Sequence, residues 1–204
     1  MRSVIRVLTV LILPLLSQAA FALQGESVFV KAIAGGGYTM VNETASDITI
    51  SFSGLSGITY LQAGGSLSKS VKIFGFTGAS IAPKPTVKTE NLKIDTVYSL
   101  QTIFDLGLGV GFYTREGWNL SLGLSIAQSY YKFNVYGVDV GTYTRHGWGS
   151  NVMFGKEFVF TPHWSIGVSA IGYYGRVYDV GTPPFQDAPV TNIYAGLAVS
   201  LMYD

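Results

Sequence analysis

The sequence predicts an all-β fold, an antiparallel up-and-down transmembrane β-barrel with eight strands. Three observations lead to this prediction. Long stretches alternate residue by residue between apolar and polar or glycine positions, as a strand between two different environments does. Charged residues make up 12% of the chain, against about 25% in an ordinary soluble domain. Beyond the N-terminal leader, no apolar run approaches the ~20 residues of a membrane helix.

The clearest alternation runs from Lys93 to Tyr113. Its even positions are almost all apolar, and its odd positions are polar or glycine. A transmembrane strand needs only about 9–11 residues to cross the bilayer, so a strand of this length would cross and still project into water. The apolar face would meet lipid, and the other face would line the inside of a barrel. The apolar even positions include Ile94, Leu100, Phe104, Leu106, Leu108, Val110 and Phe112.

The first 22 residues have the form of a secretory signal peptide. Arg2 and Arg6 supply its positive region, residues 7–16 are mostly apolar, and Ala20 and Ala22 form a small-x-small cleavage pattern. We therefore expect a signal peptide over 1–22 and one outer-membrane β-barrel domain over 23–204. The alternative, a retained anchor helix, is disfavoured because the apolar run is too short to span comfortably. The absence of cysteine excludes a lipid-modified N-terminal cysteine and any disulfide.

The remaining composition excludes several functional classes. Without Arg2 and Arg6 the mature chain carries eleven basic and twelve acidic residues, a balance that gives no reason to expect nucleic acid as a partner. Phosphate-loop and dinucleotide-binding fingerprints are absent, since the glycines at 107, 109 and 111 alternate within a strand. We expect no cofactor and no metal.

Eight segments alternate well enough to be strands. Longer polar segments follow the first, third, fifth and seventh of them, and short turns follow the others, as in barrels with long loops on one side only. Two features leave ten strands open. The alternation slips at 54–57, where a bulge or a turn would explain it, and a YTRxGW pattern occurs at both 113–118 and 143–148. We prefer eight strands, over 27–38, 47–63, 69–81, 93–113, 118–133, 143–160, 164–178 and 191–203.

Residues 155–158 (GKEF) lead into 161–164 (TPHW), and the final apolar alternation ends at Tyr203. With the signal peptide, this pattern resembles the family of small eight-stranded outer-membrane β-barrel proteins of Gram-negative bacteria. The resemblance implies a place in the cell outer membrane, contact with outer-membrane lipids and lipopolysaccharide, and insertion by the barrel-assembly machinery. One departure is Asp204, which follows Tyr203 where the family usually ends on an aromatic residue.

Three charged residues are candidates for the barrel interior. Lys31, Asp105 and Glu157 fall on inward faces by parity, and the interior of an eight-stranded barrel is just filled by side chains. We expect these charges to pair and plug the lumen, while a polar conduction path is the alternative. Lys156 falls on the lipid face and must extend toward the nearby turn.

Aromatic residues collect near the ends of the expected strands. We interpret them as two girdles at the membrane interfaces, where amphipathic rings fit the headgroup region; Tyr113, Tyr131 and Tyr173 also belong to these groups. The alternatives are a soluble sandwich core or a carbohydrate-stacking face. The principal girdle candidates are Trp118, Phe158, Phe160, Trp164 and Tyr203.

The sequence predicts no catalytic residues and therefore no enzyme. Its only histidines, His146 and His163, have no serine at a recognisable spacing and no metal-ligand cluster around them. We expect a structural or surface-interaction role, with an external ligand that the sequence does not name. The alternatives are a narrow channel for small or apolar solutes and a lipid-modifying enzyme based on His146. The loops expected to meet the outside lie around Val41, Lys84, Asp139 and Asp187.

Overall fold

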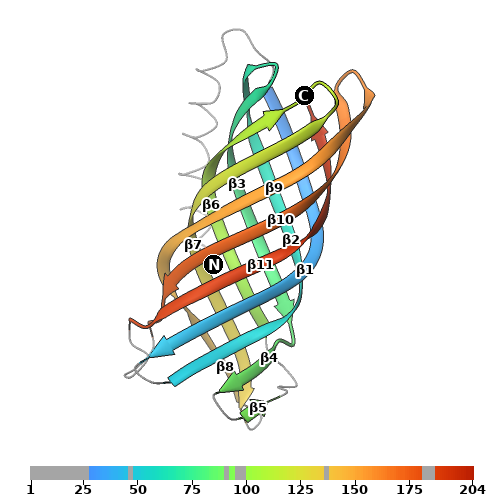
Figure 1. Ribbon diagram of the computed structural model, residues 1–204. Helices are drawn as coiled ribbons and strands as arrows, with labels where there is room; N and C mark the ends of the chain where they lie inside the picture. Colours follow the sequence, from blue (N-terminus) through green and yellow to red (C-terminus); the bar gives the residue numbers. More distant parts are fainter. Residues whose placement is uncertain (1–27, 46–47, 90–91, 95–99, 136–137, 181–186) are drawn as a thin grey trace.

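The computed structural model describes residues 28–45, 48–89, 92–94, 100–135, 138–180 and 187–204. The predicted signal peptide over 1–22 lies outside these residues. No helix within the described ranges is long and apolar enough to cross a membrane. The described chain is built almost entirely of strands (Figure 1).

Eight long antiparallel strands close into a ring (Figure 1), which confirms the predicted fold class. Strands that follow one another in the ring also follow one another in the chain, apart from the three short strands described below. The ring closes where β1 pairs with β11, in a register that runs from Val30 opposite Tyr203 to Glu43 opposite Val190. The eight strands are β1 (Val28–Ala45), β2 (Ile48–Ser68), β3 (Val71–Pro83), β6 (Leu100–Tyr113), β7 (Trp118–Val135), β9 (Arg145–Thr161), β10 (Trp164–Tyr178) and β11 (Pro189–Tyr203).

Three short strands extend the sheet at the end that carries the long connections: β4 (Thr86–Thr89), β5 (Leu92–Ile94) and β8 (Val138–Tyr143). Strand β4 pairs with β2, β5 pairs with β4, and β8 pairs with β7. The prediction of a loop over 82–92 was therefore wrong, and for 134–142 the extended structure that Val135, Val138 and Val140 had left open is the one observed. These segments continue the ladders of neighbouring strands, because an extended strand edge offers unpaired backbone groups to the next segment.

The long strand predicted over 93–113 is shorter in the structure. Strand β6 begins at Leu100, while Lys93 and Ile94 belong to β5; residues 95–99 lie outside the described part of the chain. In the other direction, β1 continues to Ala45 and β2 to Ser68, past the polar segments where loops were expected. Their polar residues suggested loops. A strand that projects from the membrane into water also carries polar residues, so polarity alone does not distinguish the two.

Neither a bulge nor a turn interrupts β2 at 54–57. Strands β1 and β2 keep one register from Val28 opposite Gly65 to Ala45 opposite Ile48. The apparent slip has a simple cause: Ser56 is a small inward residue with 6% exposure, while the neighbouring Leu55 points outward with 77% exposure. The alternation in space is regular even though the alternation in hydropathy is not.

The two YTRxGW segments lie at opposite ends of the barrel. The first forms the tight turn between β6 and β7, where the Gly117 amide donates to the Thr114 carbonyl. The second spans the junction of β8 and β9, where the Thr144 amide donates to the Ser129 carbonyl of β7. The repeat therefore does not mark a common turn, and the ten-strand alternative is excluded for the barrel wall.

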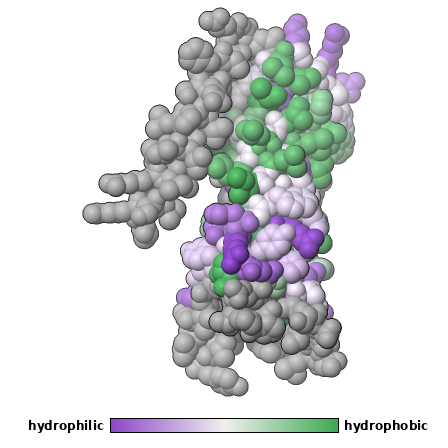
Figure 2. All heavy atoms as spheres, turned by 90° about the vertical axis from the view of Figure 1, so that its left-hand side faces the viewer, coloured by the Kyte–Doolittle hydropathy of each residue, from purple (hydrophilic) through white to green (hydrophobic). Residues whose placement is uncertain are grey.

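The outer wall carries an apolar belt. On β10, the outward positions from Trp164 to Tyr174 are apolar or small, and the next one is the exposed Arg176. These eleven residues match the length that crosses a bilayer. Figure 2 shows the apolar residues gathered on the half of the barrel nearer the short turns, with polar residues on the other half. The strands thus continue beyond the belt, on the loop side, as a polar extension.

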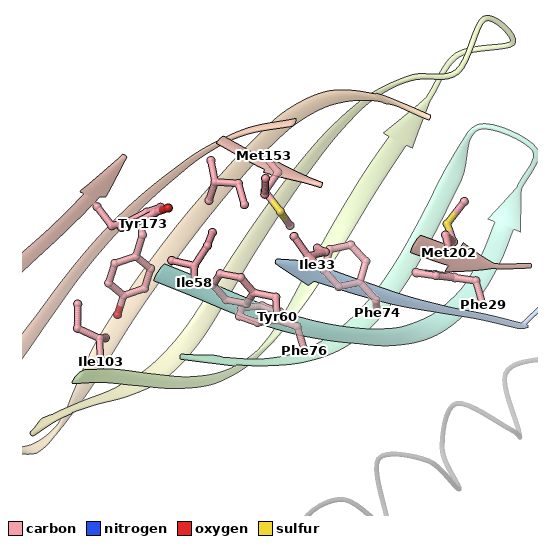
Figure 3. Packing of buried hydrophobic residues seen from close by; sticks show 13 residues of the cluster. Phe29, Ile33, Ile58, Tyr60, Phe74, Phe76, Ile103, Met153, Tyr173 and Met202 are labelled. Carbon is pink, nitrogen blue, oxygen red and sulfur yellow. The ribbon is translucent and has the colours of Figure 1, made fainter. Parts of the chain in front are cut away.

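Aromatic rings fill the interior opposite glycines. Phe76 projects from β3 toward β6 and β7, and a Cβ added to Gly107 or Gly123 would lie 2.8 Å and 2.7 Å from its ring atoms. Glycine is needed at these positions because the rings occupy the space of a side chain. Figure 3 shows the resulting column of buried side chains along the barrel, formed by Phe29, Ile33, Ile58, Tyr60, Phe74, Phe76, Ile103, Met153, Ile171, Tyr173, Tyr194, Ala198 and Met202.

The glycine positions give a first testable prediction. We expect Gly107→Ala to destabilise the barrel by about 1–3 kcal/mol, as overpacking does, because its Cβ would lie 2.0 Å from the Leu124 carbonyl oxygen. The matched control is Gly36→Ala, whose Cβ meets only the Ser56 carbonyl oxygen at 3.8 Å. Urea unfolding in detergent measures the stability of both variants. Equal unfolding midpoints for the two variants would contradict this account of the packing.

Candidate functional site

A buried ion pair crosses the barrel interior within the apolar belt. The Lys31 ammonium of β1 lies 2.5 Å from Glu157 Oε1 of β9, and the two side chains are only 3% and 4% exposed. Two other strands, β11 and β10, separate β1 from β9 along the wall. Gly167 of β10 leaves room for the carboxylate, since a Cβ there would lie 2.4 Å from Glu157 Oε2. Ser200 of β11 also donates to Glu157 Oε1, at 3.4 Å.

The third inward charge, Asp105 of β6, is not part of this pair. It is 5% exposed, and its Oδ2 accepts a hydrogen bond of 3.3 Å from the Tyr60 hydroxyl. The structure therefore brings together two of the three predicted luminal residues, Lys31 and Glu157, and places Asp105 against a tyrosine. Parity gave the face of each residue, but the pairing depends on the height of each residue in the barrel.

A second obstruction lies at the loop-side mouth. The Phe52 ring of β2 stacks on the Tyr131 ring of β7, with centroids 5.4 Å apart and planes at 14°. Strands β3 and β6 separate β2 from β7 in the wall, so the two rings meet across the lumen. Val41, Val177 and Val190 belong to the same buried cluster. The mouth is thus closed by side chains that come from opposite sides of the wall.

This cluster corrects two expectations. Val41 was expected in a loop that meets the outside, but it lies on β1 and is completely buried. Tyr131 and Tyr173 were grouped with the interface aromatics, but they point inward and are 3% and 5% exposed. Tyrosine fits either environment, so only the parity of each strand separates the two cases.

Two carboxyl groups meet beside this cluster. Glu43 of β1 and Asp179, the residue after β10, are both buried and hydrogen-bonded to each other. Burial, followed by the hydrogen bond to Asp179 and the negative charge of Asp179, raises the pKa of Glu43 to about 8. One proton is thus retained between the two carboxyls at neutral pH. The pair lies beyond the apolar belt, since the outward neighbours of Glu43 are Asn42 and Thr44. The sequence analysis missed it because 39–46 was assigned to a loop.

The remaining residues expected at the outer surface lie around this mouth. Arg145 Nη1 and Asp187 Oδ1 form an ion pair of 2.7 Å in which both side chains are more than half exposed. Lys84 is exposed and has a left-handed backbone with φ of 54°, where β3 gives way to β4. Asp139 lies in β8, and its side chain is outside the described part of the structure.

Asp204 is held at the opposite opening. Its carboxylate pairs with Lys72, whose ammonium lies 4.8 Å from the centroid of the Phe29 ring. Its backbone amide donates to the His163 carbonyl at 3.0 Å. Tyr203, the residue before it, stays on the outer wall beside Trp164, with ring centroids 5.1 Å apart. Asp204, the residue after the final aromatic Tyr203, thus covers the short-turn end of the interior.

The principal girdle candidates all project outward at the short-turn end, with exposures between 40% and 60%. The Lys156 ammonium lies over two of their rings, 5.2 Å from the Trp118 centroid and 5.6 Å from the Phe158 centroid. A second aromatic row lies toward the loop side, where Trp148 contacts Tyr174 and Tyr130 contacts Tyr143. The five candidates are Trp118, Phe158, Phe160, Trp164 and Tyr203.

The arrangement around the histidines gives no support for hydrolysis. His146 is exposed on β9, and His163 Nδ1 lies 3.1 Å from the Asp204 carbonyl oxygen. Within the described ranges, no three histidine, cysteine, aspartate or glutamate residues are grouped so as to hold a metal ion.

A closed barrel with an apolar belt, interface aromatics and short turns on one side only is an integral outer-membrane β-barrel. No family model and no curated protein matches the chain. Among solved structures, it is similar to Neisserial surface protein A, at 13% identity, TM-score 0.43 and coverage of 86% of this chain and 99% of the other. The attachment invasion locus protein Ail of Yersinia pestis matches at 13% identity and TM-score 0.42, covering 83% and 97%. The outer membrane protein AlkL matches at 12% identity and TM-score 0.47, covering 89% and 91%.

The luminal ion pair predicts a strongly non-additive mutation cycle. We expect Lys31→Met alone to cost about 3–5 kcal/mol of stability, because it leaves Glu157 buried without its counter-charge. The double variant Lys31→Met/Glu157→Leu should recover most of that loss, because no unpaired charge remains. Urea unfolding of the folded protein in detergent measures both. If the double variant were less stable than the single one, the pair would be a net source of stability and this account would fail.

The carboxyl pair predicts a pH dependence. Between pH 4.5 and about 8 the unfolded Glu43 carboxyl is ionised while the folded one keeps its proton. Its contribution to stability therefore falls as pH rises through this window, with a slope of at most about 1.4 kcal/mol per pH unit. Unfolding midpoints at pH 5.5 and 8.5 should differ less in Glu43→Gln than in the wild type. Glu116→Gln, in an exposed turn, is the control and should keep the wild-type difference; an unchanged difference in Glu43→Gln would refute the prediction.

Proposed function

We propose that this protein is a sealed outer-membrane anchor with a structural or surface-interaction role carried by its loop-side extension. The observation that carries the proposal is the filled interior. The Lys31–Glu157 pair and the column of aromatic side chains occupy the lumen within the apolar belt, and the Phe52–Tyr131 stack occupies it again at the mouth. A barrel filled in this way offers its exposed surface, rather than its lumen, for interactions.

The loop-side extension supports the same proposal. Strands β1, β2 and β7 continue beyond the apolar belt, and β4, β5 and β8 widen the sheet there. The rim presents charged side chains such as Lys84, Lys88 and Asp187. Backbone pairing of β4, β5 and β8 orders part of this rim, and an ordered surface lowers the entropy cost of binding a partner. The proposal includes outer-membrane lipids and lipopolysaccharide as the surroundings of the belt, and the barrel-assembly machinery as the partner in insertion.

A narrow channel for small or apolar solutes is the second candidate, and one observation favours it. Polar side chains follow the inner face of β7 and β9, and several of their atoms are buried without a hydrogen-bond partner: Asn119 Oδ1, Ser125 Oγ, and Asn151 Oδ1 and Nδ2. Such groups bind water in barrel interiors. The Phe76 ring lies against this face at Gly123, which argues against a continuous path for solutes.

Conductance separates the two candidates. In planar bilayers we expect the folded wild-type protein to give no discrete conductance steps, because the interior is obstructed at two levels. A matched positive control is Phe52→Ala/Tyr131→Ala combined with Lys31→Ala/Glu157→Ala, which removes the stack and the pair and should raise the frequency of conducting events. Heat-dependent migration on gels shows that each variant is folded. Steady unitary steps from the wild type would overturn the proposal and favour the channel.

A further inference from the structure

Lys156 is a cation on the lipid-facing wall. It lies on β9 between Phe154 and Phe158, which are 54% and 48% exposed on the same face. An ammonium group within an apolar belt is costly unless it reaches the interface or gains a counter-charge. Among the described residues, no carboxylate forms an ion pair with Lys156. No carboxylate of the described chain therefore neutralises this ammonium, and a lipid phosphate is an anion that could do so.

The position of Lys156 corresponds to one leaflet of the membrane. It lies opposite Trp118 in the ladder between β7 and β9, and Trp118 directly follows the tight turn that ends at Gly117. Short turns mark the periplasmic side of an outer-membrane barrel. The ammonium, held over the Trp118 and Phe158 rings, thus lies near the headgroups of the periplasmic leaflet, which consists of phospholipid.

An apolar groove begins at the same residues. It has a volume of about 680 Å³ and is lined by residues of β7, β9, β10, β11 and β1, strands that lie side by side on the wall (Figure 1). Its lining combines small and larger residues. The small ones include Gly155, Ala170 and Ala34, and the larger ones include Phe154, Val168 and Leu197.

We propose that this groove binds one anionic phospholipid of the periplasmic leaflet, with its phosphate paired to the Lys156 ammonium and an acyl chain along the groove. The charge argues for an anionic lipid, because a zwitterionic headgroup already carries a cation beside its phosphate. The aromatic rings favour the same arrangement, because they hold the ammonium at the wall without neutralising its charge. A lysine near the membrane surface attracts anionic lipids electrostatically. This inference does not depend on whether the lumen is sealed.

Trp118 allows a direct test. The variant Trp148→Phe/Trp164→Phe leaves Trp118 as the only tryptophan. This protein is reconstituted into phosphatidylcholine vesicles that contain a fixed fraction of either phosphatidylglycerol or phosphatidylcholine with brominated acyl chains, which quench a neighbouring tryptophan. We expect brominated phosphatidylglycerol to occupy the site about fivefold more readily than brominated phosphatidylcholine. Equal quenching by the two lipids would overturn the proposal.

Two substitutions in the same background identify the residue responsible. Lys156→Gln should bring the preference for brominated phosphatidylglycerol over brominated phosphatidylcholine close to one. Lys69→Gln should leave this preference unchanged, because it removes an exposed charge from the β2–β3 turn at the same end of the barrel. A preference that survives Lys156→Gln, or that falls equally in both variants, would show general surface attraction and overturn the proposal. If Lys156→Gln fails to fold, 1 M NaCl replaces it, since high salt screens an interfacial ion pair; a preference that persists at 1 M NaCl would overturn the proposal.

Discussion

The need to pair every backbone group in lipid governs this structure. A strand edge left open in the hydrocarbon region would expose amides and carbonyls with no water to satisfy them. The pairing of β1 with β11 removes that edge, and it joins the first long strand of the described chain to the last. Closure also divides the side chains into two populations, one that faces lipid and one that faces the interior. The remaining features of the molecule follow from how each population is accommodated.

The interior population must fill its own space, because eight strands enclose little more than side chains. This barrel meets that requirement by setting rings against glycines. The Phe74 and Phe76 rings lie over Gly109 and Gly107, and the Tyr173 hydroxyl lies close to the backbone at Gly149. At these positions glycine is thus a packing requirement. A consequence for function is that binding surfaces are left to the rim and the outer wall.

Three lysines show how the position of a charge decides its partner. Lys31 lies deep in the interior and is neutralised by Glu157, since a buried charge without a counter-charge is strongly destabilising. Lys72 lies at the short-turn opening, where Asp204 pairs with it. Lys156 lies on the outer wall, where aromatic rings hold it and the surrounding membrane is the available source of an anion. A lysine side chain therefore helps to fill the lumen at position 31, lies at an opening at position 72 and faces the lipid at position 156.

The sequence by itself determined the fold class and the face of most residues, because strand parity is a local property that every second residue repeats. It placed Lys31, Asp105 and Glu157 inside and Lys156 outside in this way. It preferred eight strands but left ten open, and the closed ring of pairings decided for eight. Only the tertiary structure decided which inward residues meet. The pairing of Lys31 with Glu157, the stacking of Phe52 on Tyr131 and the contact of Glu43 with Asp179 join strands distant in the chain. Such contacts depend on the tilt and register of the closed barrel, and these arise from the whole ring of pairings rather than from any one strand.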